Sequence, residues 1–134
     1  MSVIRSQRST SDMEYLSIAR KLEIFTIQKC VGFPKRYTFY LTEGISDLAK
    51  QVYIEVKAAN SIFPQNQHEA QLRRDHLISA YCALQNLISQ IEIAQEMFGI
   101  QPDALCHWME LIDSELRLVK AVMKSDRERY KSLP

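Results

Sequence analysis

The sequence contains little glycine and little proline: 3 Gly and 4 Pro among 134 residues. An average chain has roughly 7% glycine, so most of the tight turns that a β-sandwich or β-barrel requires are missing. This scarcity favours long helices with few connections. A glycine-rich phosphate-binding loop is excluded too, because the three glycines lie more than ten residues apart.

Cysteines are few and widely spaced. Cys30, Cys82 and Cys106 form no Cys-x-x-Cys pair, so neither a disulfide scaffold nor a structural zinc site is predicted, and reduced thiols in the cytoplasm are expected. We expect Cys82 and Cys106 to pack as small apolar core residues. No apolar run approaches the roughly 18 residues of a membrane span, and the first residues are polar, so neither membrane insertion nor secretion is predicted.

An excess of one charge is also missing. Lys and Arg number 17 against 16 Asp and Glu, which gives a formal charge of +1. A uniformly basic, histone-like protein is therefore excluded. With 46% hydrophobic and 25% charged residues, the composition is that of one ordinary globular domain.

The sequence does contain a sustained helical pattern. Residues 1–11 are polar and are predicted to form a flexible N-terminal arm, and residues 12–131 to form one bundle. The predicted helices cover about residues 12–31, 35–60, 67–98 and 102–130. Gly32, Pro34, Gly99 and Pro102 mark the boundaries. Short connections between long helices predict an all-α, antiparallel up-down-up-down four-helix bundle.

Each helix has its own predicted buried face. In the first helix, one side is predicted to carry Met13, Leu16, Ala19 or Arg20, Ile24 and Ile27. In the second helix, Phe39 and six later apolar residues recur at three- and four-residue steps. Gly44 interrupts the second pattern, and whether it breaks the helix is left open. The third stripe begins at Leu72, and the fourth helix includes Trp108, which we expect in the core.

Side chains that could support catalysis do not converge. A di-metal carboxylate site in a bundle needs a Glu-x-x-His pair on each of two helices, and no glutamate here has a histidine at that step. Glu92 and Glu96 share a face but fit a solvated surface. Cys106 and His107 are adjacent, so they project about 100° apart on a helix and are badly placed to share one metal or one reaction. No catalytic, cofactor or metal site is predicted.

The distribution of charge is more informative than its sum. Residues 1–36 carry a charge of +4, residues 37–116 carry −7 and residues 117–134 carry +4. In an up-down bundle, the first helix starts, the second helix ends and the fourth helix ends at the same pole. Nine basic residues are predicted to gather there as a nucleic-acid or polymerase binding site: Arg5, Arg8, Lys57, Arg73, Arg74, Lys124, Arg127, Arg129 and Lys131.

Helix-dipole complementation explains only part of this cluster. Cations in the last turns of the fourth helix are stabilised by its dipole, whereas Arg73 and Arg74 lie early in the third helix, where the dipole disfavours them. A site for a polyanion or an acidic partner is the functional interpretation. Tyr130 is the main aromatic residue nearby, so sequence-specific reading of bases is not expected.

The segment Phe33-Pro34-Lys35-Arg36-Tyr37-Thr38-Phe39, which opens a helix ending in Lys57-Ala58-Ala59-Asn60, resembles the accessory variability determinant (Avd) proteins of diversity-generating retroelements. The resemblance continues through residues 73–87 and the basic end of the fourth helix, over about residues 12–131. These proteins are grouped with four-helix-bundle proteins encoded within intervening sequences of ribosomal RNA genes.

The resemblance implies a non-enzymatic bundle that forms a homopentameric ring. Such a protein binds a reverse transcriptase and its template RNA, or other nucleic acid, through a basic surface and so supports mutagenic retrohoming. Two other hypotheses stay open. One is a bundle of unassigned role or a structural protein-interaction domain that binds no nucleic acid, and the other is a bundle enzyme with a metal or thiol site.

Overall fold

Four long helices make up the chain. The computed structural model describes the backbone of residues 2–134 and the side chains of residues 14–134. The helices are α1 (Ser2–Val31), α2 (Glu43–Asn60), α3 (Gln67–Phe98) and α4 (Pro102–Arg129). Two short turns precede α2: the 3₁₀ turn η1 (Lys35–Tyr37) and the π-helical turn η2 (Thr38–Thr42). No strand occurs in residues 2–134, so the all-α prediction is confirmed.

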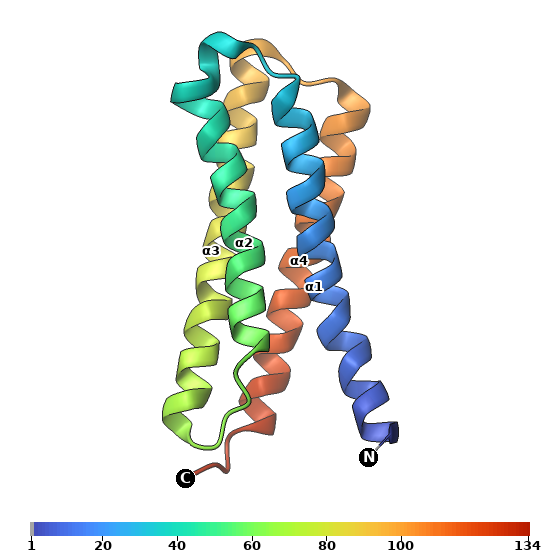
Figure 1. Cartoon of the computed structure of the whole chain (residues 1–134), viewed down its shortest axis with the longest axis vertical. Coiled ribbons are helices and arrows are strands. Elements are labelled where there is room, and N and C mark those ends of the chain that lie inside the picture. The colour runs from blue at the N-terminus through green and yellow to red at the C-terminus, as the bar shows by residue number, and fades with distance from the viewer. Residues whose placement is uncertain (1) are drawn as a thin grey trace.

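The helices lie side by side as a bundle (Figure 1). α1 and α3 each pack against both α2 and α4 and are therefore diagonal to one another. The α2–α3 connection and the C-terminal end of the chain lie at one end of the bundle, and the α3–α4 connection lies at the other (Figure 1). Contacts between α2 and α3 are the most extensive of the four pairings.

Local signals account for where α3 begins and ends and for where α4 begins. The Asn66 side chain accepts a hydrogen bond from the Glu69 backbone N–H at 2.9 Å, while the Glu69 carboxylate accepts one from the Gln65 N–H at 2.8 Å. Together they satisfy N–H groups that lack helical partners at the start of α3. Gly99 ends α3 with φ of 79°, which glycine adopts without strain. Pro102 occupies the first turn of α4.

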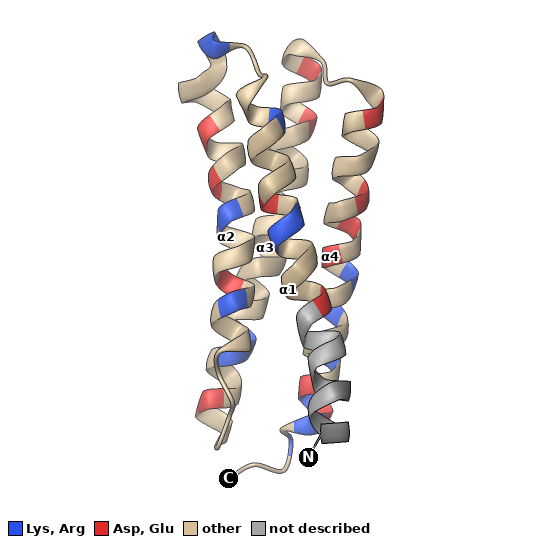
Figure 2. Cartoon of the chain, turned by 45° about the vertical axis from the view of Figure 1, so that its right-hand side comes forward, with Lys and Arg blue, Asp and Glu red and all other residues tan. Residues whose placement is uncertain are grey.

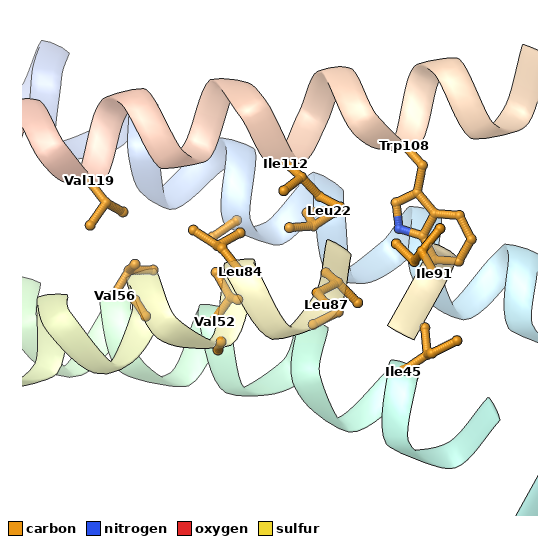
Figure 3. Packing of buried hydrophobic residues seen from close by; sticks show 14 of the residues in the cluster. Leu22, Ile45, Val52, Val56, Leu84, Leu87, Ile91, Trp108, Ile112 and Val119 are labelled. Carbon is orange, nitrogen blue, oxygen red and sulfur yellow. The ribbon is translucent and has the colours of Figure 1, made fainter. Parts of the chain in front are cut away.

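The core runs the length of the bundle and includes residues from every helix (Figure 3). Leu22 from α1, Val52 from α2, Leu87 from α3 and Ile112 from α4 are all fully buried. Trp108 is fully buried as predicted, and its indole Nε1 donates a hydrogen bond to Thr26 Oγ1 at 2.9 Å. Because the buried indole N–H has a partner, the tryptophan can pack in the core without an unsatisfied donor.

The predicted buried face of α1 is correct at Ala19, which is fully buried, and at Leu16, which packs against the core, but it is wrong at Ile24 and Ile27. Ile24 and Ile27 are 46% and 43% exposed, and the buried positions are Tyr15, Ala19, Leu22 and Thr26. The Tyr15 hydroxyl donates to Asn60 Oδ1 at 3.4 Å, and Thr26 accepts from Trp108. These hydroxyl groups can be buried because they have partners, and two isoleucines are left on the surface instead.

The helix predicted over residues 35–60 is irregular in its first two turns. Residues 35–42 form η1 and η2, and the regular α2 begins only at Glu43. Gly44 is the second residue of α2 and does not break it. In η2, Leu41 and Thr42 are buried whereas Phe39 is 80% exposed, so the prediction that Phe39 belongs to the core is wrong.

Two further expectations differ from the structure. α1 begins at Ser2 rather than near residue 12, because neither glycine nor proline interrupts residues 2–31. The side chains of the arm predicted over residues 1–11 lie outside the described residues. Cys82 and Cys106 are exposed rather than buried, because they fall outside the core-facing stripes of α3 and α4.

Candidate functional site

The basic pole is the end of the bundle formed by the last turn of α2, the first turns of α3 and the last turns of α4. We define it by seven residues whose side chains the structure describes: Lys57, Arg73, Arg74, Lys124, Arg127, Arg129 and Lys131. Figure 2 shows basic segments in the C-terminal part of α4 and acidic segments in its N-terminal half. The two remaining predicted site residues, Arg5 and Arg8, have side chains outside the described residues.

Arg73 forms the inside of the pole. Only 3% of its surface is exposed, and its Nε donates to Asp126 Oδ2 on α4 at 2.7 Å. Its Nη1 donates to the carbonyl oxygens of Ala59 at 2.9 Å and Ile62 at 3.3 Å. Burial opposes the charged form, but the hydrogen bond and charge of Asp126 outweigh burial, so the pKa of Arg73 is raised above its ordinary value. The guanidinium therefore joins three segments of the fold.

The prediction that Arg73 binds nucleic acid or a polymerase is corrected by this geometry. The guanidinium is 3% exposed and already bonded to a carboxylate and two carbonyl groups, so it offers almost no surface to an external ligand. Its position early in α3, which the helix dipole disfavours, is explained by Asp126 rather than by an external anion.

The outside of the pole is a cleft between α3 and α4 with a volume of about 400 Å³. Its cations are Arg74 from α3, Arg127 from α4 and Lys131 from the segment that follows α4. Tyr130 and Gln67 also line it. The predicted clustering of basic residues from these two parts of the chain is therefore present for these three cations.

Three cations line the cleft against one carboxylate, Asp126. Asp126 lines it but is held by Arg73, and Glu128 forms an exposed ion pair with Lys131 at 2.9 Å. Arg74 and Arg127 form no ion pair within the described residues. Exposed pairs such as Lys131–Glu128 are worth about 0–1 kcal/mol, so Lys131 can exchange partners at little cost.

Hydrogen bonds from Gln67 fix the rim of the cleft. The Gln67 side-chain amide donates to the carbonyl oxygens of Tyr130 at 2.7 Å and Leu133 at 3.0 Å, and its backbone N–H donates to the Pro134 carbonyl at 2.9 Å. These bonds hold residues 130–134 against the first turn of α3. Sequence analysis missed this role of Gln67, because no local pattern signals a contact over more than sixty residues.

The other predicted cations of the pole lie outside the cleft. Lys57, Lys124 and Arg129 are exposed. Arg129 donates to Ser125 Oγ at 3.2 Å and lies over the Tyr130 ring at 5.7 Å. They can add to the positive field around the cleft, but the structure does not place them among its lining residues.

The alternative of a metal or thiol enzyme can be compared with the side chains of the described residues. No group of three or more His, Cys, Asp or Glu side chains among them could hold a metal ion. Burial raises the pKa of the Cys30 thiol to about 11, and a hydrogen bond from the Cys106 thiol to Glu110 raises the pKa of Cys106. Both shifts reduce the thiolate fraction at neutral pH, whereas a nucleophilic cysteine needs the opposite shift.

Glu115 is a buried acid that sequence analysis missed. It lies on α4 between the core residues Ile112 and Val119 and is fully buried. Neither carboxyl oxygen has a hydrogen-bond partner among the described residues. Burial raises the pKa of Glu115 to about 9, so the carboxyl is neutral at pH 7. Glu115 lines none of the clefts described here.

Comparisons with family models, with curated proteins and with solved structures found no match to this chain. The likeness to Avd proteins therefore rests on the residues quoted above. Among the described residues, no helix combines the length and the apolar character needed to cross a bilayer.

Proposed function

We propose that this protein is a non-enzymatic accessory protein that binds a reverse transcriptase and RNA or other nucleic acid through the basic pole. The observation that carries the proposal is the convergence of Arg74, Arg127 and Lys131 on one cleft whose lining carboxylate, Asp126, is already paired with Arg73. Three cations around about 400 Å³ suit a phosphate group of a nucleic acid or a carboxylate of a partner protein.

The biological setting comes from the sequence resemblance. Phe33 to Phe39 and the basic end of α4 resemble Avd proteins, so we place the protein in a diversity-generating retroelement, where it would support mutagenic retrohoming in the cytoplasm. The raised pKa values of Cys30 and Cys106 support a binding role over thiol catalysis. A structural interaction domain that binds no nucleic acid is the competing proposal.

We also propose an up-down-up-down antiparallel order for the helices. It is supported by hydrogen bonds that join the start of one helix to the end of another. Arg73, early in α3, pairs with Asp126, late in α4. Trp108, early in α4, pairs with Thr26, late in α1.

Self-association, with the pentamer that the resemblance implies, is part of the same proposal. Ile24, Ile27 and Val31 are exposed on α1, and Ile93 and Met97 are exposed on α3. Because α1 and α3 are diagonal, these apolar residues lie on different sides of the bundle. Contact between two different surfaces of identical subunits generates a ring when the rotation closes. Light scattering should therefore give an oligomer, and Ile27→Glu with Val31→Glu should give a monomer.

The test of the basic pole is binding of labelled RNA by fluorescence anisotropy at several salt concentrations. The variant Arg74→Ala/Arg127→Ala/Lys131→Ala should bind more weakly. Its slope of log affinity against log salt should be shallower by about 2, because three phosphate contacts to a single strand are lost. A matched control, Arg20→Ala/Lys50→Ala/Arg117→Ala, removes three exposed cations from other surfaces and should retain most of the affinity and slope.

Capture of the reverse transcriptase by immobilised protein, with and without nuclease, tests the second partner. Loss of capture for the pole variant, together with retention by the control, supports the proposal. Equal RNA affinity, salt slope and polymerase capture for both triple variants would contradict it.

A further inference from the structure

Residues 24–42 have an unusual composition. They contain no aspartate or glutamate, three cations (Lys29, Lys35 and Arg36) and five aromatic residues (Phe25, Phe33, Tyr37, Phe39 and Tyr40). In the folded chain they form the end of α1, the following connection, η1 and η2. This part of the chain lies at the opposite end of the bundle from the basic pole (Figure 1).

Three of the five aromatic rings pack inward. Phe25 contacts Trp108 with 6.0 Å between ring centroids, and Phe33 contacts Phe98 at 4.8 Å. Tyr37 stacks on Phe98 at 5.4 Å with only 16° between the ring planes. These contacts join the end of α1, the following connection and η1 to Phe98 at the end of α3 and to Trp108 near the start of α4. The side of η1 and η2 that faces the bundle, here called their base, is therefore held by the core.

The other two rings point outward from this fixed base. Phe39 and Tyr40 are 80% and 83% exposed, whereas the next two residues, Leu41 and Thr42, are buried. The Cys30 Sγ lies 3.9 Å from the Thr42 carbonyl oxygen and adds a link to α1. A π-helical turn is rare and is frequently found at functional sites. Here it presents two adjacent aromatic side chains on a base that the core holds in place.

The geometry of the two rings leaves aromatic surface free. Phe39 and Tyr40 lie edge to face, with 5.6 Å between centroids and 87° between planes. They therefore do not stack on each other. Each side chain retains most of its surface in water, which costs free energy unless a partner covers it.

The charges beside the rings favour one class of partner. Lys35 and Arg36 are exposed one turn before the rings, and no acid occurs until Glu43. Figure 2 shows basic ribbon at this connection and acidic segments at the neighbouring ends of α3 and α4. Aromatic rings interspersed with cations are the arrangement that binds single-stranded nucleic acid, since bases stack on the rings and phosphates meet the cations.

We propose that Phe39, Tyr40, Lys35 and Arg36, here called the aromatic tip, form a second binding surface for unpaired nucleic acid. Bases stack on Phe39 and Tyr40, and Lys35 and Arg36 contact the adjacent phosphates. This proposal rests on the proposed function in one respect: the aromatic tip and the basic pole are both taken to bind nucleic acid. α3 has 32 residues, or about 48 Å at 1.5 Å per residue, so the aromatic tip and the basic pole can be altered separately.

Fluorescence anisotropy with a labelled single-stranded oligouridine and an RNA duplex of equal length tests the proposal. Phe39→Ala and Tyr40→Ala should each weaken oligouridine binding about tenfold, because stacking on one base is lost. Their salt slope should stay unchanged, whereas Lys35→Ala/Arg36→Ala should reduce it by about 1. Duplex binding should change little in the ring variants, because paired bases are not free to stack.

A matched control is Ile54→Ala/Ile78→Ala, which trims exposed apolar side chains that belong to neither proposed site nor to the proposed subunit contact and should leave oligouridine affinity unchanged. Tyr40→Phe should retain binding because it keeps the ring. Circular dichroism should show that the ring variants stay folded, as both side chains are exposed. Light scattering of the same variants shows whether they alter the oligomer.

The outcomes separate this proposal from the proposed function. If the pole variant loses RNA binding while the ring variants keep full affinity for oligouridine, the aromatic tip is not a nucleic-acid surface. If the ring variants change only the oligomeric state or polymerase capture, the tip is a protein contact and the proposal is wrong. If the ring variants lose oligouridine while the pole variant binds normally, the tip proposal is supported and the pole proposal fails.

Discussion

The inside and the outside of the basic pole differ although the same residue type forms both. Arg73 and Arg74 are adjacent on α3, and successive helical residues point about 100° apart. Arg73 is 3% exposed and held by Asp126 and two carbonyl groups. Arg74 lines the cleft and has no ion pair with the rest of the described chain. One arginine thus stabilises the fold and leaves its neighbour available to a ligand.

The same contrast applies to the two buried acids of α4. Asp126 has Arg73 as its partner, whereas Glu115 has none among the described residues. A buried charge is tolerated when it is paired, and an unpaired buried carboxyl is instead held neutral. Asp126 therefore supports the site through its ion pair with Arg73, and Glu115 makes the stability of the bundle depend on pH.

Breaking the inside of the pole should have the largest effect. Arg73→Ala leaves Asp126 buried without its partner and is expected to lower the free energy of unfolding by about 3–5 kcal/mol. Urea denaturation followed by circular dichroism measures this loss. The double variant Arg73→Met/Asp126→Leu should lose less, because no buried charge remains unpaired. An equal or greater loss in the double variant would contradict this account of the ion pair.

The Glu115 carboxyl should give the second largest effect, through pH. The folded chain keeps this proton up to about pH 9, while the unfolded chain releases it near the ordinary pKa of 4.5. The folded state therefore binds more protons between these values, so stability falls as pH rises through that window, by roughly 1.4 kcal/mol per pH unit.

The variant Glu115→Leu isolates this contribution. It should be more stable than the natural chain at pH 8 and should show a flatter dependence of unfolding free energy on pH. Urea denaturation at pH 5, 6, 7 and 8 measures both. Parallel pH profiles for the two proteins would show that Glu115 does not titrate as the structure indicates.

Altering the outside of the pole should affect stability least. Arg74→Ala removes a side chain with no ion-pair partner in the described chain, so the free energy of unfolding should change by no more than about 0.5 kcal/mol. Thermal unfolding compared with Arg73→Ala sharpens the contrast between the neighbours. Destabilisation of similar size in both variants would mean that Arg74 is structural too.

The boundary between α3 and α4 could be predicted from sequence better than the faces that the helices bury. Gly99 and Pro102 mark the boundary between α3 and α4, because their backbone preferences are local. At the start of α3, Leu72 is 42% exposed whereas its neighbour Arg73 is buried. Which of the two side chains is buried depends on Asp126, a residue far away in the sequence that pairs with Arg73. Hydropathy alone cannot predict that a paired arginine is more deeply buried than a neighbouring leucine.

The site was only partly predictable for the same reason. Charge along the chain predicted that Arg74, Arg127 and Lys131 gather at one end, and they line one cleft. Long-range hydrogen bonds determine that Arg73 is the buried cation and that Gln67 fixes the rim of the cleft. Neither could be predicted from local sequence. The π-helical turn has no simple sequence signature, so the exposure of Phe39 and Tyr40 was missed.

The most direct test of the central claim is an NMR titration of the arginine Nε–Hε signals with single-stranded RNA. The account predicts that the signals of Arg74 and Arg127 shift as RNA is added. The signal of Arg73, whose Nε is bonded to Asp126 at 2.7 Å, should stay in place. Saturable RNA binding that leaves the Arg74 and Arg127 signals unmoved would contradict the claim that the outside of the basic pole is the binding site.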